Sequence, residues 1–398
     1  MKIERLLSIC LEKRSRREMK GYLSRKVTTI VAVGLLVVNG LGANLVLGYG
    51  TSRVKNIVLL IGDGMGLTQV AAARIKALGA EGRLYIERMP VTGLINVHSA
   101  DKLITDSGAA STALATGYKT RNGMIGVNPE GKRLLTILEA ARNKGMATGL
   151  VVTSTITHAT PAAFAAHVKS RYDELTIAVQ MLENKVNVMM GGGRAYFLPK
   201  ELGGKRRDGR NLIEEAKAIG YTYVETKDGL QAADGEYLLG LFQMEALTTT
   251  ASEEPRLAEM TAKAIEILSR NENGFFLMVE GSQIDWACHR NNPYETIRQT
   301  LLFDEAVKVV LEFATRDTST LVVVTADHEC GGMAINGGSL DGRNLEIGWT
   351  TGGHTGVPVP IFAHGPGAGY FTGLHDNTEI PRIFAKLLGI EGFPHVCE

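Results

Sequence analysis

The sequence predicts an α/β fold, with a single domain built on a largely parallel central β-sheet and helices on both of its faces. Past Arg53, short apolar runs alternate with longer segments of helical periodicity, which is the pattern of α/β proteins. The apolar runs show no polar alternation, so we expect both faces of each strand to be buried. Glycine directly follows several helical segments, as expected where helices end.

Six apolar runs are the candidate strands, and several of them are rich in valine. They are residues 56–61, 147–152, 186–190, 275–279, 321–325 and 359–363. Six other segments have the apolar spacing of helices. They are residues 134–144, 173–184, 212–219, 255–270, 295–314 and 378–388. The glycine-rich and charge-rich segments 191–210 and 331–353 show no sustained period, so we expect them to be short surface insertions.

The composition of the 398 residues is that of an ordinary globular protein, 44% hydrophobic and 21% charged. These values argue against disorder, collagen-like repeats and coiled coil. The 43 Lys and Arg residues against 42 Asp and Glu residues give a net charge of +1. A protein that neutralises many phosphates of a nucleic acid is usually far more basic. We therefore expect no nucleic acid as a specific partner.

The first 50 residues differ in composition from the rest. Residues 1–26 contain nine basic and three acidic side chains, and residues 27–50 contain no charged side chain. A basic stretch followed by an apolar run is typical of an export signal. We expect residues 1–50 to be an amino-terminal extension with a signal peptide or an uncleaved membrane anchor, and residues 51–398 to form the folded domain. The protein would then be exported, to a periplasmic or extracellular location, or anchored to the membrane if the signal is not cleaved.

The chain has four cysteines, Cys10, Cys288, Cys330 and Cys397. Four are too few to build a disulfide scaffold in a chain of this length. No Cys-x-x-Cys pair occurs, so we expect no structural zinc site made of cysteines. The packed core must therefore supply the stability.

Carboxylates and histidines lie where several candidate strands end. Asp63 follows the first run, Glu280 and then Asp285 and His289 follow the run 275–279, Asp327 and His328 follow 321–325, and His354 precedes 359–363. Ligands of open α/β sheets bind beyond the carboxyl ends of the strands. A lone Asp there is most often a helix cap, and a lone His is most often a hydrogen-bonded core or surface group. Repetition in four segments favours a cluster of several metals, with imidazole suited to zinc and oxygen ligands to magnesium.

A second pattern lies in residues 105–117, which predict a helix that opens at or just after Ser107 and ends at Gly117. In one interpretation, Asp106 or Ser107 only caps this helix. In the other, a hydroxyl at the helix amino terminus lies beside free N–H groups that suit phosphate, and a nearby metal activates it as a nucleophile. Arg171 could bind phosphate oxygens with both arms of its guanidinium.

These motifs together resemble the alkaline phosphatases over residues 56–388. The resemblance rests on six short segments in the same order along the chain. They are Gly62-Asp63-Gly64-Met65-Gly66, Asp106-Ser107-Gly108-Ala109-Ala110-Ser111, Ala159-Thr160-Pro161-Ala162-Ala163, Val279-Glu280-Gly281, Thr325-Ala326-Asp327-His328-Glu329 and His354-Thr355-Gly356.

The resemblance implies that Ser107 is the nucleophile and becomes phosphoserine, while Arg171 clamps the phosphate and is held in part by Asp106. It also implies three metal ions, two of them zinc, for which cobalt could substitute, and the third magnesium or another divalent metal. The implied ligands are Asp285, His289 and His354 for the first zinc, Asp63, Asp327 and His328 for the second, and Asp63, Thr160 and Glu280 for the third metal.

The family further implies that residues 51–398 are a catalytic domain that acts on small phosphate monoesters, and that the chain forms a homodimer. Two departures concern the third metal site, because His158 and Trp286 stand where well-known bacterial members carry an Asp and a basic residue. The 25 residues between His328 and His354 are too few for the large crown of many relatives. A phosphodiesterase, a sulfatase, a mutase or a catalytically silent exported binding protein are the alternatives, although no Cys-x-Pro-x-Arg sulfatase signature occurs.

Overall fold

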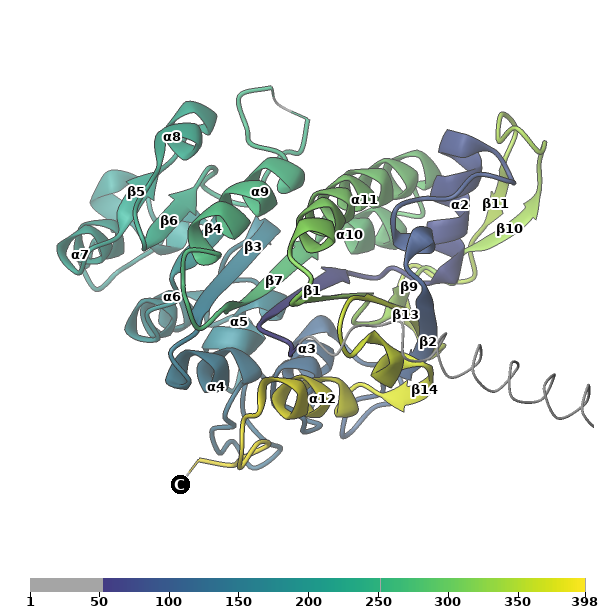
Figure 1. Ribbon diagram of the computed structural model, residues 1–398. Helices are drawn as coiled ribbons and strands as arrows, with labels where there is room; N and C mark the ends of the chain where they lie inside the picture. The colour runs from purple at the N-terminus through teal and green to yellow at the C-terminus, as the bar shows by residue number, and fades with distance from the viewer. Residues whose placement is uncertain (1–52, 251, 398) are drawn as a thin grey trace, which may run out of the picture. The chain divides into compact units, whose positions relative to one another are not determined.

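The computed structural model describes residues 53–250 and 252–397, so the predictions for residues 1–50 lie outside the described residues. All six candidate strands form, and they belong to one ten-stranded sheet with the order β14-β2-β13-β8-β1-β7-β3-β4-β6-β5 (Figure 1). The predicted strands are β1 (Asn56–Gly62), β3 (Ala147–Thr155), β4 (Val188–Gly192), β7 (Phe275–Gly281), β8 (Thr320–Thr325) and β13 (Val359–His364). Every residue of β1, β3, β4, β7 and β8 is buried, as the continuous apolar runs predict.

Four strands of the sheet were not predicted, and all of them lie toward its two ends. They are β2 (Val91–Asn96), β5 (Thr222–Val224), β6 (Leu238–Leu241) and β14 (Gly373–Asp376). Three have at most four residues, and β2 alternates buried and exposed positions. Only β13 runs antiparallel to both of its neighbours, β8 and β2. The sheet is therefore largely parallel, as predicted.

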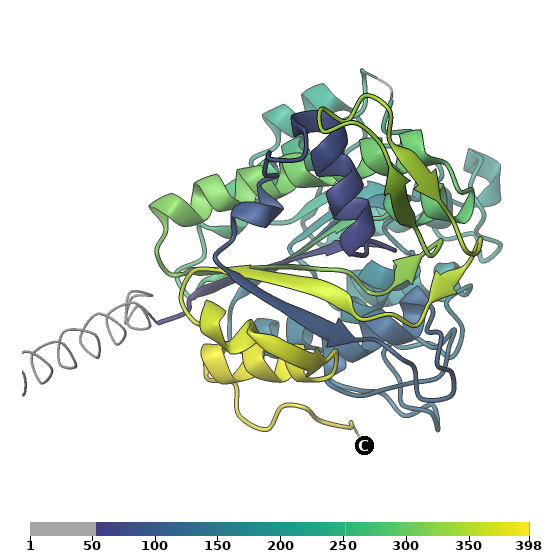
Figure 2. The same ribbon diagram turned by 90° about the vertical axis from the view of Figure 1, so that its right-hand side faces the viewer.

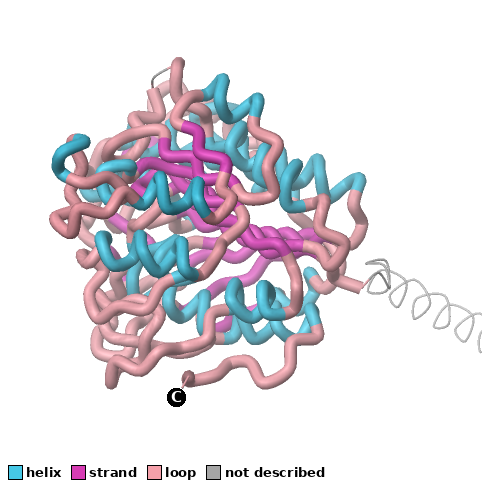
Figure 3. The backbone as a smooth tube through the Cα atoms, turned by 90° about the vertical axis from the view of Figure 1, so that its left-hand side faces the viewer, coloured by secondary structure: helices cyan, strands magenta, loops and turns pink. Residues whose placement is uncertain are grey.

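Helices cover both faces of the sheet, which Figures 2 and 3 show as a strand layer between two helical layers. In the described residues, one layer contains α2 (Leu67–Leu78), α9 (Leu257–Leu268), α10 (Gln283–His289) and α11 (Pro293–Arg316). The other contains α3 (Ser107–Thr116), α4 (Ile137–Asn143), α5 (Ala159–Ala165) and α12 (Glu379–Leu388). The remaining helices lie around the half of the sheet that contains β4, β5 and β6 (Figure 1). They are α6 (Glu174–Glu183), α7 (Leu212–Ala218) and α8 (Lys227–Ala232).

Most predicted helices form with small shifts at their ends, but α4 starts later than the predicted residue 134. Leu134 instead forms a β-bridge with Val396. Thr136 then caps α4 in a reciprocal pair with Glu139, since each side chain accepts from the other residue's backbone N–H. The helix α2 was not predicted at all.

The two predicted surface insertions carry short ordered elements. Residues 331–353 contain a hairpin of β10 (Ala334–Gly337) and β11 (Glu346–Gly348), and apolar side chains of this hairpin pack with Ala72 of α2. Residues 191–210 begin with the end of β4 and continue through two 3₁₀ turns, Arg194–Tyr196 and Lys200–Leu202. None of the helices in the described part of the chain combines the length and apolar character needed to span a membrane.

The parallel register brings several strand ends to one edge of the sheet. Gly62 at the end of β1 pairs with Gly281 of β7, and Ile61 pairs with Thr325 at the end of β8. Val152, near the end of β3, pairs with Glu280. The segments that follow these strands therefore meet, and the polar residues predicted at the strand ends lie close together.

Candidate active site

The first group of candidate metal ligands consists of Asp285, His289 and His354. Asp285 and His289 lie one turn apart on α10, and His354 lies on the short strand β12 (His354–Thr355). The carboxylate of Asp285 is 3.3 Å from Nε2 of His289 and 3.4 Å from Nε2 of His354. The two Nε2 atoms are 3.2 Å apart. The three side chains therefore converge, as the sequence predicted.

The ring orientations of both histidines are set by the backbone. Nδ1 of His289 is 2.7 Å from the carbonyl oxygen of Gly352, and Nδ1 of His354 is 2.9 Å from that of Thr105. A carbonyl oxygen only accepts, so each Nδ1 donates a proton to it, and Nε2 is the ring nitrogen that each histidine directs toward the group. This is the arrangement usual for metal-binding histidines.

The second group consists of Asp63, Asp327 and His328, and His328 brings it next to Ser107. Nε2 of His328 is 3.2 Å from Oδ2 of Asp327, 3.5 Å from Oδ1 of Asp63 and 3.3 Å from Oγ of Ser107. The three ligand candidates are fully buried, and Ser107 is 3% exposed. The other oxygen of Asp327 accepts from the backbone N–H groups of Gly64 and His328.

The third group includes Asp63, Glu280 and His158, whose ligand atoms lie within 4.8 Å of one another. Ser282 donates a hydrogen bond of 2.8 Å to Oε2 of Glu280. Burial is the main cause that raises the pKa of Glu280, to about 8. Thr160, at the start of α5, is also fully buried.

Several buried oxygens of these groups have no hydrogen-bond partner. They are both carboxylate oxygens of Asp63, Oδ1 of Asp285, Oδ2 of Asp327, Oε1 of Glu280 and Oγ1 of Thr160. Burial, together with repulsion from the neighbouring carboxylates, raises the pKa of Asp63 well above its ordinary value. Buried carboxylates are stable when they are paired or bind cations. The donor set therefore fits bound divalent metal ions. Two imidazoles lie in the first group, and one lies in each of the other two groups, which are otherwise made of oxygen donors.

Ser107 begins α3, and Asp106 caps this helix by accepting from the backbone N–H of Ala109. The other carboxylate oxygen of Asp106 accepts from Nη1 of Arg171 at 3.0 Å and from the backbone N–H of Gly123. Asp106 is therefore the cap, as the first interpretation has it. The Ser107 hydroxyl lies at the start of the helix and close to His328, and its role as a nucleophile stays a prediction. The helix ends at Gly117 in the left-handed conformation, as predicted.

His158 lies beside this arginine, and Trp286 lies beside His158. Nη2 of Arg171 is 3.2 Å from Nε2 of His158, and the rings of His158 and Trp286 meet edge to face with centroids 6.1 Å apart. A guanidinium only donates hydrogen bonds, so Nε2 of His158 is the acceptor. Burial and the charge of Arg171 lower the pKa of His158 to about 3.

Two residues of this region were not predicted as site residues. Cys330 lies in β9 (Glu329–Cys330) and shares the first group with Asp285, His289 and His354. Glu329 is buried and accepts from Gln69 and from two backbone N–H groups, which orders the segment that follows Asp327 and His328. Both residues come directly after Asp327 and His328 in the sequence. Residues this close along the chain can be either ligands or mere neighbours of ligands, and sequence spacing alone does not tell the two apart.

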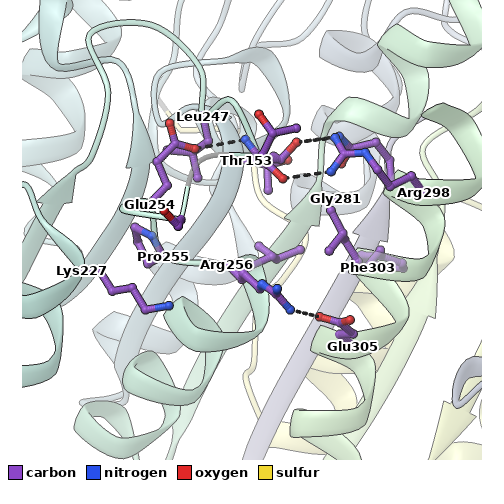
Figure 4. Close-up of a pocket in the computed structure, with 16 residues that line it drawn as sticks. Thr153, Lys227, Leu247, Glu254, Pro255, Arg256, Gly281, Arg298, Phe303 and Glu305 are labelled. Atoms are coloured by element: carbon purple, nitrogen blue, oxygen red, sulfur yellow. Dashed lines mark hydrogen bonds and ion pairs between the residues drawn. The ribbon is translucent and has the colours of Figure 1, made fainter.

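A cavity of about 590 Å³ lies near the ends of β3 and β7, and Figure 4 shows the residues that line it. Among the described residues that line it, none is a predicted site residue, although Gly281 follows Glu280 directly. Its arginines are already engaged. Arg298 donates to the carbonyl and the hydroxyl of Thr249, and Arg256 lies 3.6 Å from Glu305. This cavity therefore differs from the buried centre around Ser107.

Comparison with known proteins agrees with this geometry. The family model described as alkaline phosphatase matches residues 54–345 and 342–390. Alkaline phosphatase 4 of Bacillus subtilis is 35% identical over 85% of this chain and 89% of its own length. Alkaline phosphatase of Escherichia coli is 36% identical over 85% and 86%, respectively.

Solved structures give the same result. Alkaline phosphatase from the Antarctic bacterium TAB5 superposes with a TM-score of 0.78 at 35% identity, covering 85% of this chain and 99% of that one. The enzyme of Thermus thermophilus superposes with a TM-score of 0.80 at 27% identity, covering 87% and 94%.

The fold and the site define a metal-binding hydrolase of the α/β class. More particularly, the chain belongs to the alkaline phosphatase family, as its motifs indicated, and it is an enzyme that hydrolyses phosphate esters.

Proposed function

We propose that this chain hydrolyses small phosphate monoesters through a phosphoserine intermediate at Ser107. The observation that carries the proposal is the position of the Ser107 hydroxyl. It lies 3.3 Å from Nε2 of His328, in a centre where both oxygens of Asp63 lack hydrogen-bond partners. The same hydroxyl opens α3, next to the carboxylate that holds Arg171.

Three metal ions would be held by the residues that converge here. Asp285, His289 and His354 would hold one zinc, and Asp63, Asp327 and His328 would hold the other, with cobalt as a substitute. Asp63, Thr160 and Glu280 would hold magnesium or another divalent metal. When bound, such ions lower the pKa of hydroxyl groups and water and stabilise negative charge on the transferred phosphoryl group.

The protein's own residues account for the rest of the reaction. Arg171 and the N–H groups at the start of α3 bind the phosphoryl oxygens and stabilise their charge in the transition state. The Ser107 oxygen attacks phosphorus and gives up its proton, and the bond from phosphorus to the ester oxygen breaks. The departing oxygen takes up a proton and leaves as the alcohol. Water then attacks phosphorus on the side opposite the Ser107 oxygen. The bond from phosphorus to the Ser107 oxygen breaks, inorganic phosphate leaves, and Ser107 recovers a proton that comes from the water. Because recognition is directed at the phosphoryl group, the enzyme should accept many alcohols as leaving groups.

The nature of the third metal depends on His158. A solved variant of the TAB5 enzyme, in which a histidine is replaced by aspartate, is described with magnesium bound in the third metal site. In this chain, His158 lies in the group with Asp63 and Glu280. An imidazole does not orient the water ligands of magnesium as a carboxylate does. We therefore expect weak magnesium binding here, and zinc or cobalt are the competing ions.

The remaining proposals concern location and assembly. Residues 1–50 would direct export, as a cleaved signal or as a membrane anchor, and residues 51–398 would be the catalytic domain. A membrane-bound alkaline phosphatase of Bombyx mori is 33% identical over 90% of this chain and 84% of its own length. By family resemblance, the chain would act as a homodimer.

A hydrolysis assay with a chromogenic phosphate monoester tests the proposed function. Metals are removed and then restored one at a time, and a phosphate diester is assayed in parallel. We expect turnover of the monoester that depends on zinc or cobalt. Faster turnover of the diester, or no hydrolysis by the reconstituted enzyme, would contradict the proposal.

A further inference from the structure

Cys330 is placed opposite a metal-ligand candidate by the backbone. The strands β9 and β12 are antiparallel, and Cys330 pairs with His354 in their register. Side chains of directly paired residues lie on the same face of such a ladder, with Cβ atoms about 4.5–5.5 Å apart. Cys330 is fully buried, and its thiol donates to the carbonyl oxygen of Asp285 at 3.7 Å.

The thiol therefore belongs to a converging set of four donors. The ligand atoms of Asp285, His289, Cys330 and His354 all lie within 4.8 Å of one another. Donors around one tetrahedral zinc are roughly 3.3–3.8 Å apart, given bond lengths of about 2.0–2.3 Å. Displacements of about one ångström would thus close the set around a single ion.

A second observation also indicates a ligand at this place. Asp285 is 5% exposed, and its Oδ1 makes no hydrogen bond, although it faces Nε2 of His354 at 3.4 Å. The two histidines present Nε2 toward the same point, because their Nδ1 atoms bond to backbone carbonyls. The other buried thiol of the region, Cys288, differs from Cys330, since it contacts Gln69 and Thr296.

We propose that Cys330 supplies a sulfur ligand to the metal ion bound by Asp285, His289 and His354. This inference rests on the proposed function, which assigns a zinc to these three residues. Thiolate ligands favour zinc, cobalt and cadmium over magnesium, and the other two groups offer only oxygen and nitrogen. The sulfur would make this position the most selective for thiophilic ions, and coordination would release the thiol proton to solvent.

Cobalt-substituted protein tests the proposal directly. The full domain is loaded with Co²⁺, bound cobalt is counted, and the near-ultraviolet spectrum is searched for a band of charge transfer from thiolate to Co²⁺. We expect the band in the parent protein and its loss in Cys330→Ser. Cys288→Ser is the matched control, because it removes a buried thiol outside the donor set, and it should keep the band. We also expect Cys330→Ser to lower the preference for cadmium over zinc by about tenfold or more.

A second test uses only the parent protein, so its result does not depend on whether a variant folds. X-ray absorption at the zinc edge should show sulfur at about 2.3 Å in addition to nitrogen and oxygen at about 2.0–2.2 Å. Zinc surrounded only by nitrogen and oxygen, or a cobalt band that persists in Cys330→Ser, would overturn the inference. If the metal-loaded enzyme hydrolyses the monoester but shows no sulfur ligand, only the role of Cys330 is wrong. If it binds no metal and has no activity, the proposed function fails as well.

Discussion

Asp106 caps the helix that begins at Ser107 and at the same time holds Arg171, with 3.0 Å between Oδ2 and Nη1. Burial by itself would raise the pKa of Asp106, but the N–H of Ala109 and the charge of Arg171 lower it below its ordinary value. One carboxylate therefore orients both Ser107 and Arg171, the proposed nucleophile and the proposed phosphate clamp. This double contact makes Asp106 a positioning residue for the proposed reaction.

Asp106→Ala should raise KM for a phosphate monoester by about tenfold to a hundredfold, because Arg171 loses a charge-assisted hydrogen bond. It should also lower the free energy of unfolding by about 1 kcal/mol through loss of the cap. Asn211→Ala is the control, because Asn211 caps α7 in the half of the sheet that contains β5. The control should lose similar stability and keep its KM. Equal KM values for both variants would show that Asp106 acts only as a cap.

Ser107→Ala should lower kcat by at least about 10³-fold, as expected when a nucleophile is removed. The parent enzyme, incubated with radioactive phosphate and quenched in acid, should carry label on the peptide that contains Ser107. Ser111→Ala, one turn further along the same buried helix, should keep both label and activity. Label on another residue would refute the assignment.

Removal of metals by a chelator should abolish activity, and zinc or cobalt should restore it where magnesium alone does not. The reason is that His289, His328 and His354 supply imidazole ligands to the two proposed zinc sites. Activity and bound metal are measured together after each addition. A mock-treated sample controls for loss of folded protein. Full activity after verified removal of all metals would contradict this prediction.

His158→Asp should make activity respond to lower magnesium concentrations, by about tenfold or more. The new carboxylate would replace an imidazole nitrogen that lies 3.2 Å from Arg171. Adding Trp286→Lys should tighten inhibition by inorganic phosphate, because it places a positive charge beside the clamp. Tyr370→Lys is the control and should leave phosphate inhibition unchanged. Tyr370 lies in the 3₁₀ turn that follows β13, and because β13 is antiparallel, this turn lies at the opposite edge of the sheet. Identical magnesium titrations and unchanged phosphate inhibition would show that neither position controls the site.

Glu139 should contribute to acid sensitivity of the fold. Burial would raise the pKa of Glu139, but contacts with His167, the N–H of Thr136 and Arg133 lower it from 4.5 to about 2. A carboxyl group with a lowered pKa stabilises the folded state above pH 4.5, and this contribution is lost as the pH falls toward 2. The contribution is at most about 3 kcal/mol.

The measurement for Glu139 is the urea midpoint as a function of pH. Glu139→Gln should be less stable than the parent at pH 7, and its midpoint should change less between pH 5 and pH 2.5. Glu183→Gln, which alters an exposed carboxylate on α6, should follow the parent throughout. A parallel pH dependence in Glu139→Gln and the parent would refute the role of this carboxylate.

The central strands could be predicted from the sequence because burial on both faces leaves continuous apolar runs, as in β1, β7 and β8. The short outer strands β5, β6 and β14 could not, since segments of three or four residues carry little periodic signal. The hairpin of β10 and β11 could not be predicted either. Its strands are short, and its apolar residues pack on α2, which was itself not predicted.

The sequence by itself determined the fold class, the family and the chemical types at the strand ends, because these are encoded locally in short motifs. The family resemblance implied two of the contacts in the site, but only the tertiary structure shows how the chain brings these side chains together. Asp106 meets Arg171 across 65 positions of the chain, and His354 meets Asp285 because β12 folds back on β9. The sequence shows Cys330 only as one of four cysteines, and the pairing of β9 with β12 places it opposite His354. Such contacts depend on strand register and loop paths, which follow from packing of the whole domain and leave no periodic trace in the sequence.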